Sequence, residues 1–428
     1  MRVLMFGWEF PPYHAGGLGP ACQGLTKGLS AHGVEVTFVV PRLPGAVTDK
    51  FLRVMDAENW AENQDQTIPG LKYMPIEAAL VPYVTPESYG ELQEKINQAR
   101  GKEAKGGEIY GRNLFAEVKR FAILAGMIAK QEDFVLIHAH DWMTYPAGIA
   151  AKQATGKPLV LHVHATEFER TDGHPNQVIY EIERAGFAAA DLIVPVGQWM
   201  KAKIVERYGI DPAKIVPLHN AVDITPEDMQ QRLEKLSPLD KVVLFVGRVT
   251  IQKGPEFFLQ TAKRVLEVDP KVTFIMVGSG DMLNYIIEQT AAMDLADKFI
   301  FPGFLKGEAL KKIFALADVF VMPSVAEPFG LVPLEAMQRG VPAIISKQSG
   351  VAEMFENALK VDFWDIDEMA NKILGLLEHA PLRKEMVRNG QKELTGISWQ
   401  KQGAKMAEIY QRVLQSIKNR PRKTKHKN

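Results

Sequence analysis

The sequence predicts an α/β protein built from two domains, each with a parallel sheet. Short apolar runs typical of buried parallel strands alternate with segments of helical spacing along most of the chain. One charged stretch, 225–240, interrupts this alternation and carries two prolines, so it is predicted to be a linker. With 428 residues, 46% of them hydrophobic, the chain is long enough to bury two ordinary cores.

Composition argues against several kinds of partner. The 51 basic and 51 acidic residues cancel, which gives no reason to expect nucleic acid or a charged membrane surface. Cys22 is the only cysteine, so no intrachain disulfide can form and a reducing, cytoplasmic location is expected. No apolar run approaches the ~18 residues of a transmembrane helix, and Gly7 and Pro11 break the N-terminus too early for a signal peptide. The strongly basic segment 418–428 is predicted to be a disordered tail.

The first domain begins with a strand, a glycine-rich loop and a helix. The strand covers 2–7, and Gly16 and Gly17 lie between it and the helix that follows. Glycines let the backbone approach a phosphate or a sugar closely, although a plain turn also explains the pair. After a second strand at 34–40, the segment 44–111 is irregular. It is predicted to shape the acceptor side of a binding site, with a purely structural excursion as the alternative.

Four histidines mark the ends of the next two strands. Period-two spacing places each pair on one face of its strand, so neighbouring strands would bring four imidazoles and a carboxylate together. This arrangement permits a metal-dependent hydrolase. That alternative is less favoured, because such a centre needs further carboxylate ligands and leaves the second half of the chain unexplained. The residues concerned are His138, His140, Asp141 and Trp142 after the strand 135–138, and His162 and His164 in the strand 158–164.

The remainder of the first domain continues the alternation. Glu167, Glu169 and Arg170 fall in a polar turn; they are expected to be solvated charges, with a place in the lining of the cleft as the alternative. A helix at 112–130 precedes the two histidine strands. After them, helices are predicted at 175–189 and 198–207, and strands at 191–196 and 214–218.

The second domain opens with a basic loop between the strand 242–246 and the helix 255–266. Arg248 and Lys253 lie in that loop, where arginine can hold a diphosphate through its planar fork and lysine as a point charge. A solvated basic loop is the ordinary alternative. Gly278 follows the next strand, 273–277, at a turn expected to approach a nucleotide.

The most informative stretch is 322–340, which joins the apolar strand 318–322 to a helix. Glu327 lies before the turn and Glu335 after it, so the two carboxylates can flank one concavity. Alternatively, Glu335 only complements the dipole of its own helix and Glu327 is a solvated loop charge. The floor of the concavity would be the N–H groups of Phe329, Gly330, Leu331 and Val332, which attract an anion such as a diphosphate.

Two acidic residues near the C-terminus have a simple structural interpretation. Asp365 and Asp367 match a metal-binding D-x-D pattern formally, but aspartate at a helix start is an ordinary N-cap. Two further helices are predicted at 382–394 and 399–417.

A family resemblance is visible in the segment Pro323-Ser-Val-Ala-Glu327-Pro-Phe-Gly-Leu-Val-Pro-Leu-Glu335-Ala-Met337. It resembles the signature of retaining GT-B glycosyltransferases of family GT4 and of the related glycogen and starch synthases. The resemblance implies that Glu327 lies near the transferred sugar and that Glu335 holds the ribose of the nucleotide.

Other segments extend the resemblance along the chain. Gly247-Arg248 to Lys253-Gly254 is similar to the family's donor-diphosphate motif, and Gly16 and Gly17 are similar to the glycines whose amides face the donor phosphates. His164 matches a histidine that contacts the donor sugar. One departure concerns Ala15, which stands where bacterial glycogen synthases usually carry lysine. His140, Asp141 and Trp142 match the family's H-x-H-D-W and are placed by resemblance on the acceptor side.

The resemblance implies a GT-B fold, with two Rossmann-like domains facing across a cleft. The predicted boundaries are 1–222 for the first domain, 223–240 for the linker, 241–396 for the donor domain and 397–417 for a helix that crosses back.

The function expected from this resemblance is that of a glycogen- or starch-synthase-like transferase. It would move glucose from ADP- or UDP-glucose to a glycan without a metal or other cofactor. The catalytic residues would be Glu327, His164, Arg248 and Lys253. The main alternative is a GT4 enzyme that glycosylates a small sugar, a lipid or a cell-surface glycan. A catalytically silent nucleotide-sugar binder is less favoured, because the acidic, basic and histidine positions are all present.

Overall fold

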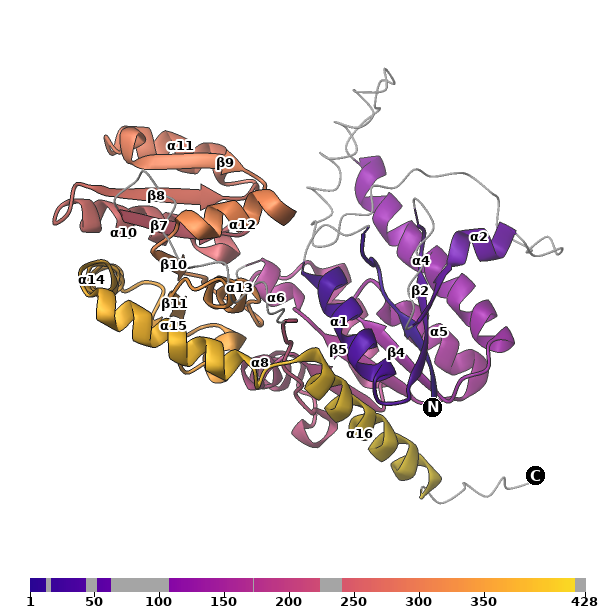
Figure 1. Cartoon of the computed structure of the whole chain (residues 1–428). Coiled ribbons are helices and arrows are strands. Elements are labelled where there is room, and N and C mark those ends of the chain that lie inside the picture. The colour runs from indigo at the N-terminus through magenta and orange to yellow at the C-terminus, as the bar shows by residue number, and fades with distance from the viewer. Residues whose placement is uncertain (13–16, 44–51, 63–107, 172, 224–240, 420–428) are drawn as a thin grey trace, which may run out of the picture.

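The computed structural model describes residues 1–12, 17–43, 52–62, 108–171, 173–223 and 241–419. In the helix that begins at residue 108, side chains are described from residue 114 onward. These residues form two separate six-stranded sheets whose strand pairs are all parallel. Figure 1 shows each sheet with helices packed around it. The predicted fold class, α/β with two parallel sheets, is confirmed.

The first sheet has the order β3-β2-β1-β4-β5-β6. Its strands β4 and β5 are neighbours, and their register pairs His140 with His162. The strands are β1 (Arg2–Phe6), β2 (Glu35–Val40), β3 (Arg53–Asp56), β4 (Leu136–His140), β5 (Leu159–Val163) and β6 (Leu192–Pro195). The helices are α1 (Leu18–Ser30), α2 (Ala57–Glu62), α4 (Glu108–Gln131), α5 (Tyr145–Thr155), α6 (Glu167–Arg170), α7 (Gln177–Ala189) and α8 (Gln198–Tyr208).

The second sheet has the order β12-β11-β10-β7-β8-β9, so β10 and β7 lie side by side at its centre. The strands are β7 (Lys241–Val246), β8 (Val272–Val277), β9 (Phe299–Gly303), β10 (Val319–Met322), β11 (Ala343–Ser346) and β12 (Leu359–Val361). The helices are α10 (Pro255–Leu266), α11 (Leu283–Ala292), α12 (Gly307–Leu316), α13 (Val332–Gln338), α14 (Ile366–Glu378) and α15 (Ala380–Leu394), with the short η4 (Gly350–Glu353) before β12.

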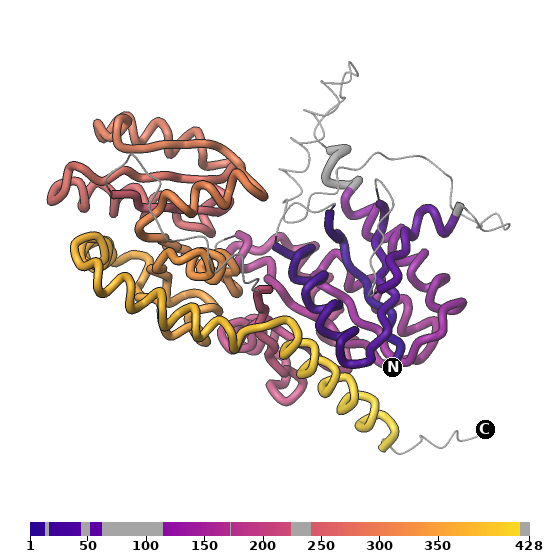
Figure 2. The backbone as a smooth tube through the Cα atoms, viewed as in Figure 1, coloured from indigo at the N-terminus to yellow at the C-terminus, as the bar shows by residue number. Residues whose placement is uncertain are grey.

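The last helix, α16 (Trp399–Lys418), leaves the second half and lies along α1 of the first half (Figures 1 and 2). Glycines make this packing close: a Cβ on Gly28 would lie 2.1 Å from the carbonyl oxygen of Trp399, and one on Gly403 would lie 2.1 Å from Gly28. The Tyr410 hydroxyl lies 2.5 Å from Nδ1 of His138, which ties the helix to the centre of the first sheet. The last described helix therefore lies on the half in which the chain begins.

Some local predictions from the sequence are confirmed by the structure and others are wrong. The strand expected at 214–218 is wrong, since only one isolated bridge joins Ile215 to β6 and Pro217 has no N–H to extend a ladder. The N-cap interpretation of Asp365 is confirmed, because its carboxylate accepts the N–H of Glu368 at 3.0 Å. Within the described residues, none of the helices combines the length and the apolar character needed to cross a membrane.

Several predictions fall outside the described residues. They concern Gly16, most of the segment 44–111, the linker beyond residue 223 and the basic tail beyond residue 419. The domain boundaries and the cytoplasmic location stay predictions.

Candidate active site

The carboxyl edge of the second sheet brings three predicted site residues together. Arg248 and Lys253 follow β7, and Glu327 follows the neighbouring strand β10. The Lys253 ammonium forms an ion pair with the buried carboxylate of Glu327, which also accepts the hydroxyl of Ser324 at 3.3 Å. This pairing holds an anionic carboxylate and a cation side by side at the edge where ligands bind in open α/β sheets.

A residue that sequence reasoning missed connects these loops. Gln252 is buried; its side-chain oxygen accepts from Arg248 at 3.0 Å and its side-chain N–H donates to the carbonyl of Ala326 at 3.0 Å. Its own carbonyl accepts the N–H of Val325 at 3.0 Å. Gln252 thus fixes the basic loop to the loop that carries the catalytic candidate. Its position between Arg248 and Lys253 was the only signal in the sequence.

Two glycines let the loops of this edge lie against one another. A Cβ on Gly254 would lie 2.1 Å from the carbonyl oxygen of Pro323, and one on Gly278 would lie 1.8 Å from the carbonyl oxygen of Gly247. Both glycines also have positive φ, 66° and 147°. Any side chain at either position would separate the loops that hold the basic residues.

Glu335 lies on the other side of the Gly330 turn, in a cavity of about 580 Å³ between the two halves. Burial raises the pKa of Glu335, and the nearby Arg339 guanidinium opposes that shift. Glu327 is not among the lining residues, so the two carboxylates do not flank one concavity as expected. The cavity is lined mainly by α1, α12 and α13, and its cations are Lys27, Lys306, Lys311 and Arg339.

The turn between Glu327 and Glu335 has the expected form. Phe329 is buried, Gly330 has a φ of +93°, and the backbone then enters α13 at Val332. Gly17 approaches this turn from the first half, since a Cβ there would lie 3.9 Å from Leu331. The described end of the glycine-rich loop therefore faces the turn between Glu327 and Glu335.

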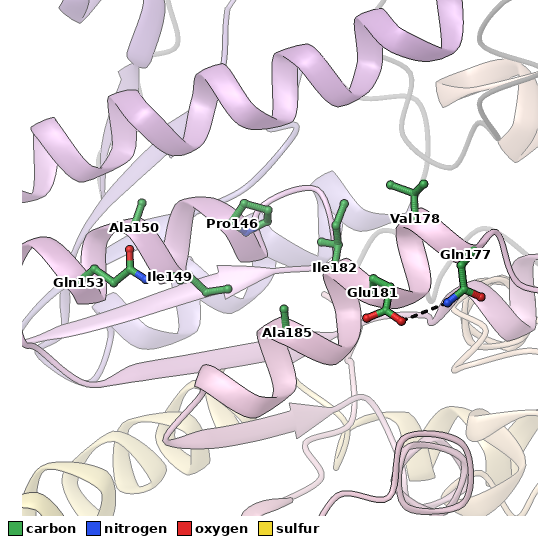
Figure 3. A pocket seen from close by; sticks show the side chains of 9 residues that line it. All are labelled: Pro146, Ile149, Ala150, Gln153, Gln177, Val178, Glu181, Ile182 and Ala185. Atoms are coloured by element: carbon green, nitrogen blue, oxygen red, sulfur yellow. Dashed lines mark hydrogen bonds between the residues drawn. The ribbon is translucent and has the colours of Figure 1, made fainter.

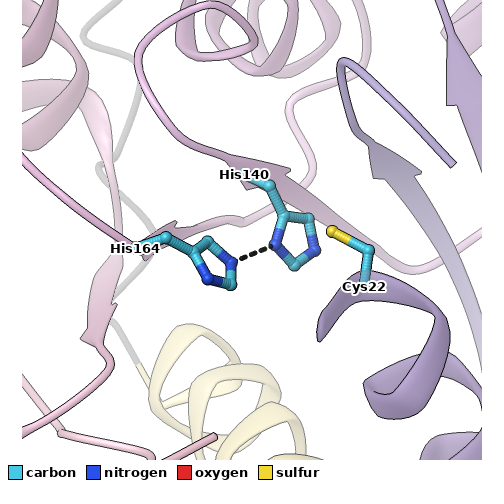
Figure 4. Close-up of side chains that lie close together, drawn as sticks. All are labelled: Cys22, His140 and His164. Atoms are coloured by element: carbon cyan, nitrogen blue, oxygen red, sulfur yellow. Dashed lines mark hydrogen bonds between the residues drawn. The ribbon is translucent and has the colours of Figure 1, made fainter. Parts of the chain in front are cut away.

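The four histidines converge as predicted. The ring centroids of His138 and His140 are 4.4 Å apart and those of His162 and His164 are 4.5 Å apart, with near-parallel planes. Nδ1 of His140 lies 3.0 Å from Nε2 of His164 (Figure 4). Burial lowers the pKa of all four imidazoles, that of His164 to about 3, so the rings are neutral near pH 7.

The ring geometry bears on the metal alternative. Cys22, His140 and His164, and likewise His138, His140 and His162, have potential ligand atoms within 4.8 Å of one another. However, the planes of the second group differ by only 8° to 24°. Imidazole lone pairs lie in the ring plane, so stacked rings direct them side by side instead of toward one point. In this second group the arrangement favours a packed column of neutral rings over a hydrolytic metal centre.

Asp141 anchors the backbone of His164. Its carboxylate is fully buried, accepts the N–H of His164 at 2.7 Å and pairs with Arg170 at 3.2 Å. His140, Asp141 and Trp142 were predicted to lie on the acceptor side, but all three are buried. In this structure they support the position of His164 and are not exposed to an acceptor.

The charges of the neighbouring helix α6 are not solvated, so that expectation is wrong. Glu167 and Glu169 are buried, and the Arg170 side chain is only 8% exposed. Thr166 and Glu169 form a capping box, and Arg170 compensates the acidic groups around it, including Glu183, whose pKa is raised to about 8 by burial.

A second hollow lies between α5 and α7 of the first half (Figure 3). Its lining is mostly aliphatic, with Ile149, Val178 and Ile182 prominent, and Glu181 there is hydrogen-bonded to Gln177 at 3.1 Å. A groove of this kind does not suit a diphosphate. The charged cavity between the halves is the better candidate for the ribose end of a nucleotide.

Comparison with known proteins agrees with this geometry. Residues 16–221 match the model of the glycosyl transferase 4-like domain, and residues 228–393 match the model of glycosyl transferases group 1. Together the two matches span nearly the whole chain.

Individual relatives cover the same length. The chain is 27% identical to an uncharacterized glycosyltransferase of Methanocaldococcus jannaschii, over 97% of this chain and 100% of that protein. It is 26% identical to the glycogen synthase of Mycobacterium tuberculosis, over 96% of this chain and 94% of that protein. The solved structure of Anabaena HepE in complex with UDP and glucose is similar, with a TM-score of 0.65 and 18% identity over 96% of this chain and 99% of that one. The chain belongs to the GT4 family of group 1 glycosyltransferases, which act on nucleotide sugars and have the GT-B fold.

Proposed function

We propose that the protein transfers glucose from UDP- or ADP-glucose to a glycan acceptor with retention at the anomeric carbon, as a glycogen or starch synthase does. The observation that carries the proposal is the Lys253–Glu327 ion pair at the carboxyl edge of the second sheet, with Arg248 held beside it through Gln252. The near full-length similarity to a glycogen synthase supports a glucan acceptor.

The leaving group is the part of the donor that needs most stabilisation. As the bond between the sugar C1 and the diphosphate oxygen breaks, negative charge grows on the diphosphate and positive charge grows on the sugar ring. Arg248 and Lys253 would neutralise the diphosphate, and the anionic Glu327 would stabilise the ring. The acceptor hydroxyl oxygen then bonds to C1 and its proton passes to the departing diphosphate, which balances the reaction.

Two other residues would orient the donor. Glu335 would accept the ribose hydroxyls in the cavity between the halves. His164 is neutral, so it can exchange a hydrogen bond with a sugar hydroxyl without adding charge beside the forming cation. His140 would fix the orientation of the His164 ring through the 3.0 Å contact between their nitrogens.

A second candidate is a GT4 enzyme that glycosylates a small sugar, a lipid or a cell-surface glycan. Ala15 favours it, because bacterial glycogen synthases usually carry lysine just before the glycine pair. The two candidates share the donor chemistry and differ only in the acceptor.

A donor and acceptor panel tests the proposal. The purified protein is incubated with UDP-, ADP- and GDP-sugars, with glycogen, with small sugars or without acceptor, and release of the nucleoside diphosphate is measured. UDP- or ADP-glucose with glycogen is expected to give the fastest release, and EDTA is expected to leave that rate unchanged because protein cations neutralise the leaving group. Turnover only with small acceptors would support the second candidate. Hydrolysis that EDTA abolishes and zinc restores would contradict both.

A further inference from the structure

We propose that Glu353 is a latch that holds the two halves together and positions the loop of Glu327. Glu353 ends η4 in the second half, and its carboxylate accepts two N–H groups at the start of α8 in the first half. These are the N–H of Gln198, at 2.7 Å, and that of Trp199. The same carboxylate lies 3.1 Å from Nε2 of His219, which also belongs to the first half. Three contacts from one side chain therefore cross between the halves.

Helix α8 is built to receive a carboxylate from outside. Its N-cap is Gly197, which has no side chain to satisfy the free N–H groups of the first turn. A Cβ on Gly197 would lie 3.0 Å from an oxygen of Glu353, so glycine leaves the space that the carboxylate occupies. The positive end of the helix dipole favours an anion there. In agreement, burial alone would raise the pKa of Glu353, but the hydrogen bonds from His219 and from the first N–H groups of α8 lower that pKa below its ordinary value.

The segment that leads to Glu353 is hydrogen-bonded to the loop that carries Glu327. The N–H of Gly350 donates to the carbonyl of Glu327 at 2.9 Å, and the N–H of Val351 donates to the carbonyl of Phe329 at 2.7 Å. His219 also packs against Phe329, with ring centroids 6.1 Å apart. A movement that separates Glu353 from α8 would consequently pull on the backbone of Glu327 and Phe329, just before Gly330.

A second connection between the halves runs through Asp223, at the start of the linker, near the Glu335 cavity. The Lys27 ammonium pairs with Asp223 at 2.7 Å, and the side chain of Gln338 donates to the Asp223 carbonyl at 3.0 Å. These groups are more exposed than the Glu353 carboxylate: the side chains of Lys27 and Asp223 are 57% and 49% exposed, and that of Glu353 is 21% exposed. Solvent screens exposed pairs strongly, so Glu353 is expected to provide the larger share of the connection.

The test compares Glu353→Gln and Glu353→Ala with a matched control, Glu393→Gln. Glu393 also accepts two backbone N–H groups, from Glu356 at 2.8 Å and Asn357 at 3.1 Å, but all its partners lie in the second half. We expect the KM for the donor to rise about tenfold in the Glu353 variants, with kcat within threefold of wild type, because a smaller fraction of the free enzyme has the halves joined. Glu393→Gln is expected to keep the wild-type KM.

Small-angle X-ray scattering gives a readout that does not depend on catalysis. The radius of gyration with and without UDP is expected to be larger for both Glu353 variants than for wild type and Glu393→Gln, at unchanged melting temperature. Gly197→Ala should shift it in the same direction without altering any charge, because the added Cβ crowds the carboxylate. The kinetic part rests on the proposed function, whereas the scattering part stands if no donor is turned over. Wild-type scattering in both Glu353 variants would overturn the latch, as would a fall in kcat at unchanged KM.

Discussion

Replacing Glu327 with glutamine is expected to lower sugar transfer by about 10³-fold while the affinity for UDP stays close to that of wild type. The substitution keeps the shape and removes only the negative charge that would stabilise the cationic sugar ring. Lys253 loses its ion-pair partner and becomes fully available to the donor diphosphate, so nucleotide binding is not expected to weaken. The measurement combines initial rates with calorimetric titration of UDP.

A suitable control is Asp269→Asn. Asp269 forms a partly buried ion pair with Lys241, which is the same chemistry, but Lys241 begins β7, so the pair lies at the opposite end of that strand from Arg248 and Lys253. This variant should transfer sugar at the wild-type rate. If Glu327→Gln were to work within threefold of wild type, Glu327 would have no part in the chemistry, and the proposed arrangement of the donor would be wrong.

The histidine column is expected to make the fold sensitive to acid. Burial lowers the pKa of all four imidazoles from the ordinary value of 6.5, to about 3 for His164. Below pH 6.5 the unfolded chain therefore binds protons that the folded chain refuses, so the stability that these groups contribute is complete above 6.5 and is lost as the pH falls. Each imidazole that stays neutral in the folded state while the unfolded chain binds a proton contributes a slope of at most about 1.4 kcal/mol per pH unit.

Buried glutamates act in the opposite direction, so the test is a difference between variants. The pKa of Glu183 is raised to about 8, which means that the folded state keeps a proton there that the unfolded state loses above its ordinary value of 4.5. His162→Phe keeps a stacked ring and removes one of the four imidazoles. The free energy of unfolding of His162→Phe, relative to that of wild type, should rise by about 1.4 kcal/mol for each unit by which the pH is lowered from 6 to 4.

Urea denaturation at a series of pH values measures this difference. The exposed His174 supplies the control, since His174→Gln should follow the wild-type profile. A constant difference between His162→Phe and wild type across this range would mean that His162 titrates normally in the folded protein.

Local patterns were sufficient to predict much of this molecule. The helix at 255–266 has the predicted bounds because Gly254 and Pro255 mark its start directly in the sequence. The turn after β10 was predicted for the same reason, since the strand, Gly330 and the helix are contiguous. The three-residue strand β12 was missed, because so short a run carries no period.

Contacts between distant segments could not be predicted in this way. The ion pair of Lys253 and Glu327 joins residues 74 positions apart, and the contact of Glu353 with Gln198 spans 155 positions. The burial of Glu167 likewise depends on Arg170 and Glu183, whose meeting depends on how α6 and α7 pack. Sequence patterns identified the chemical groups of the site, and tertiary packing decided which of them meet.

A crystal structure with bound UDP tests most directly whether the donor diphosphate lies at the carboxyl edge of the second sheet. The diphosphate should lie within hydrogen-bonding distance of Arg248 and Lys253, and the ribose hydroxyls should contact Glu335. A diphosphate bound elsewhere, with Lys253 still paired only to Glu327, would contradict this placement of the donor.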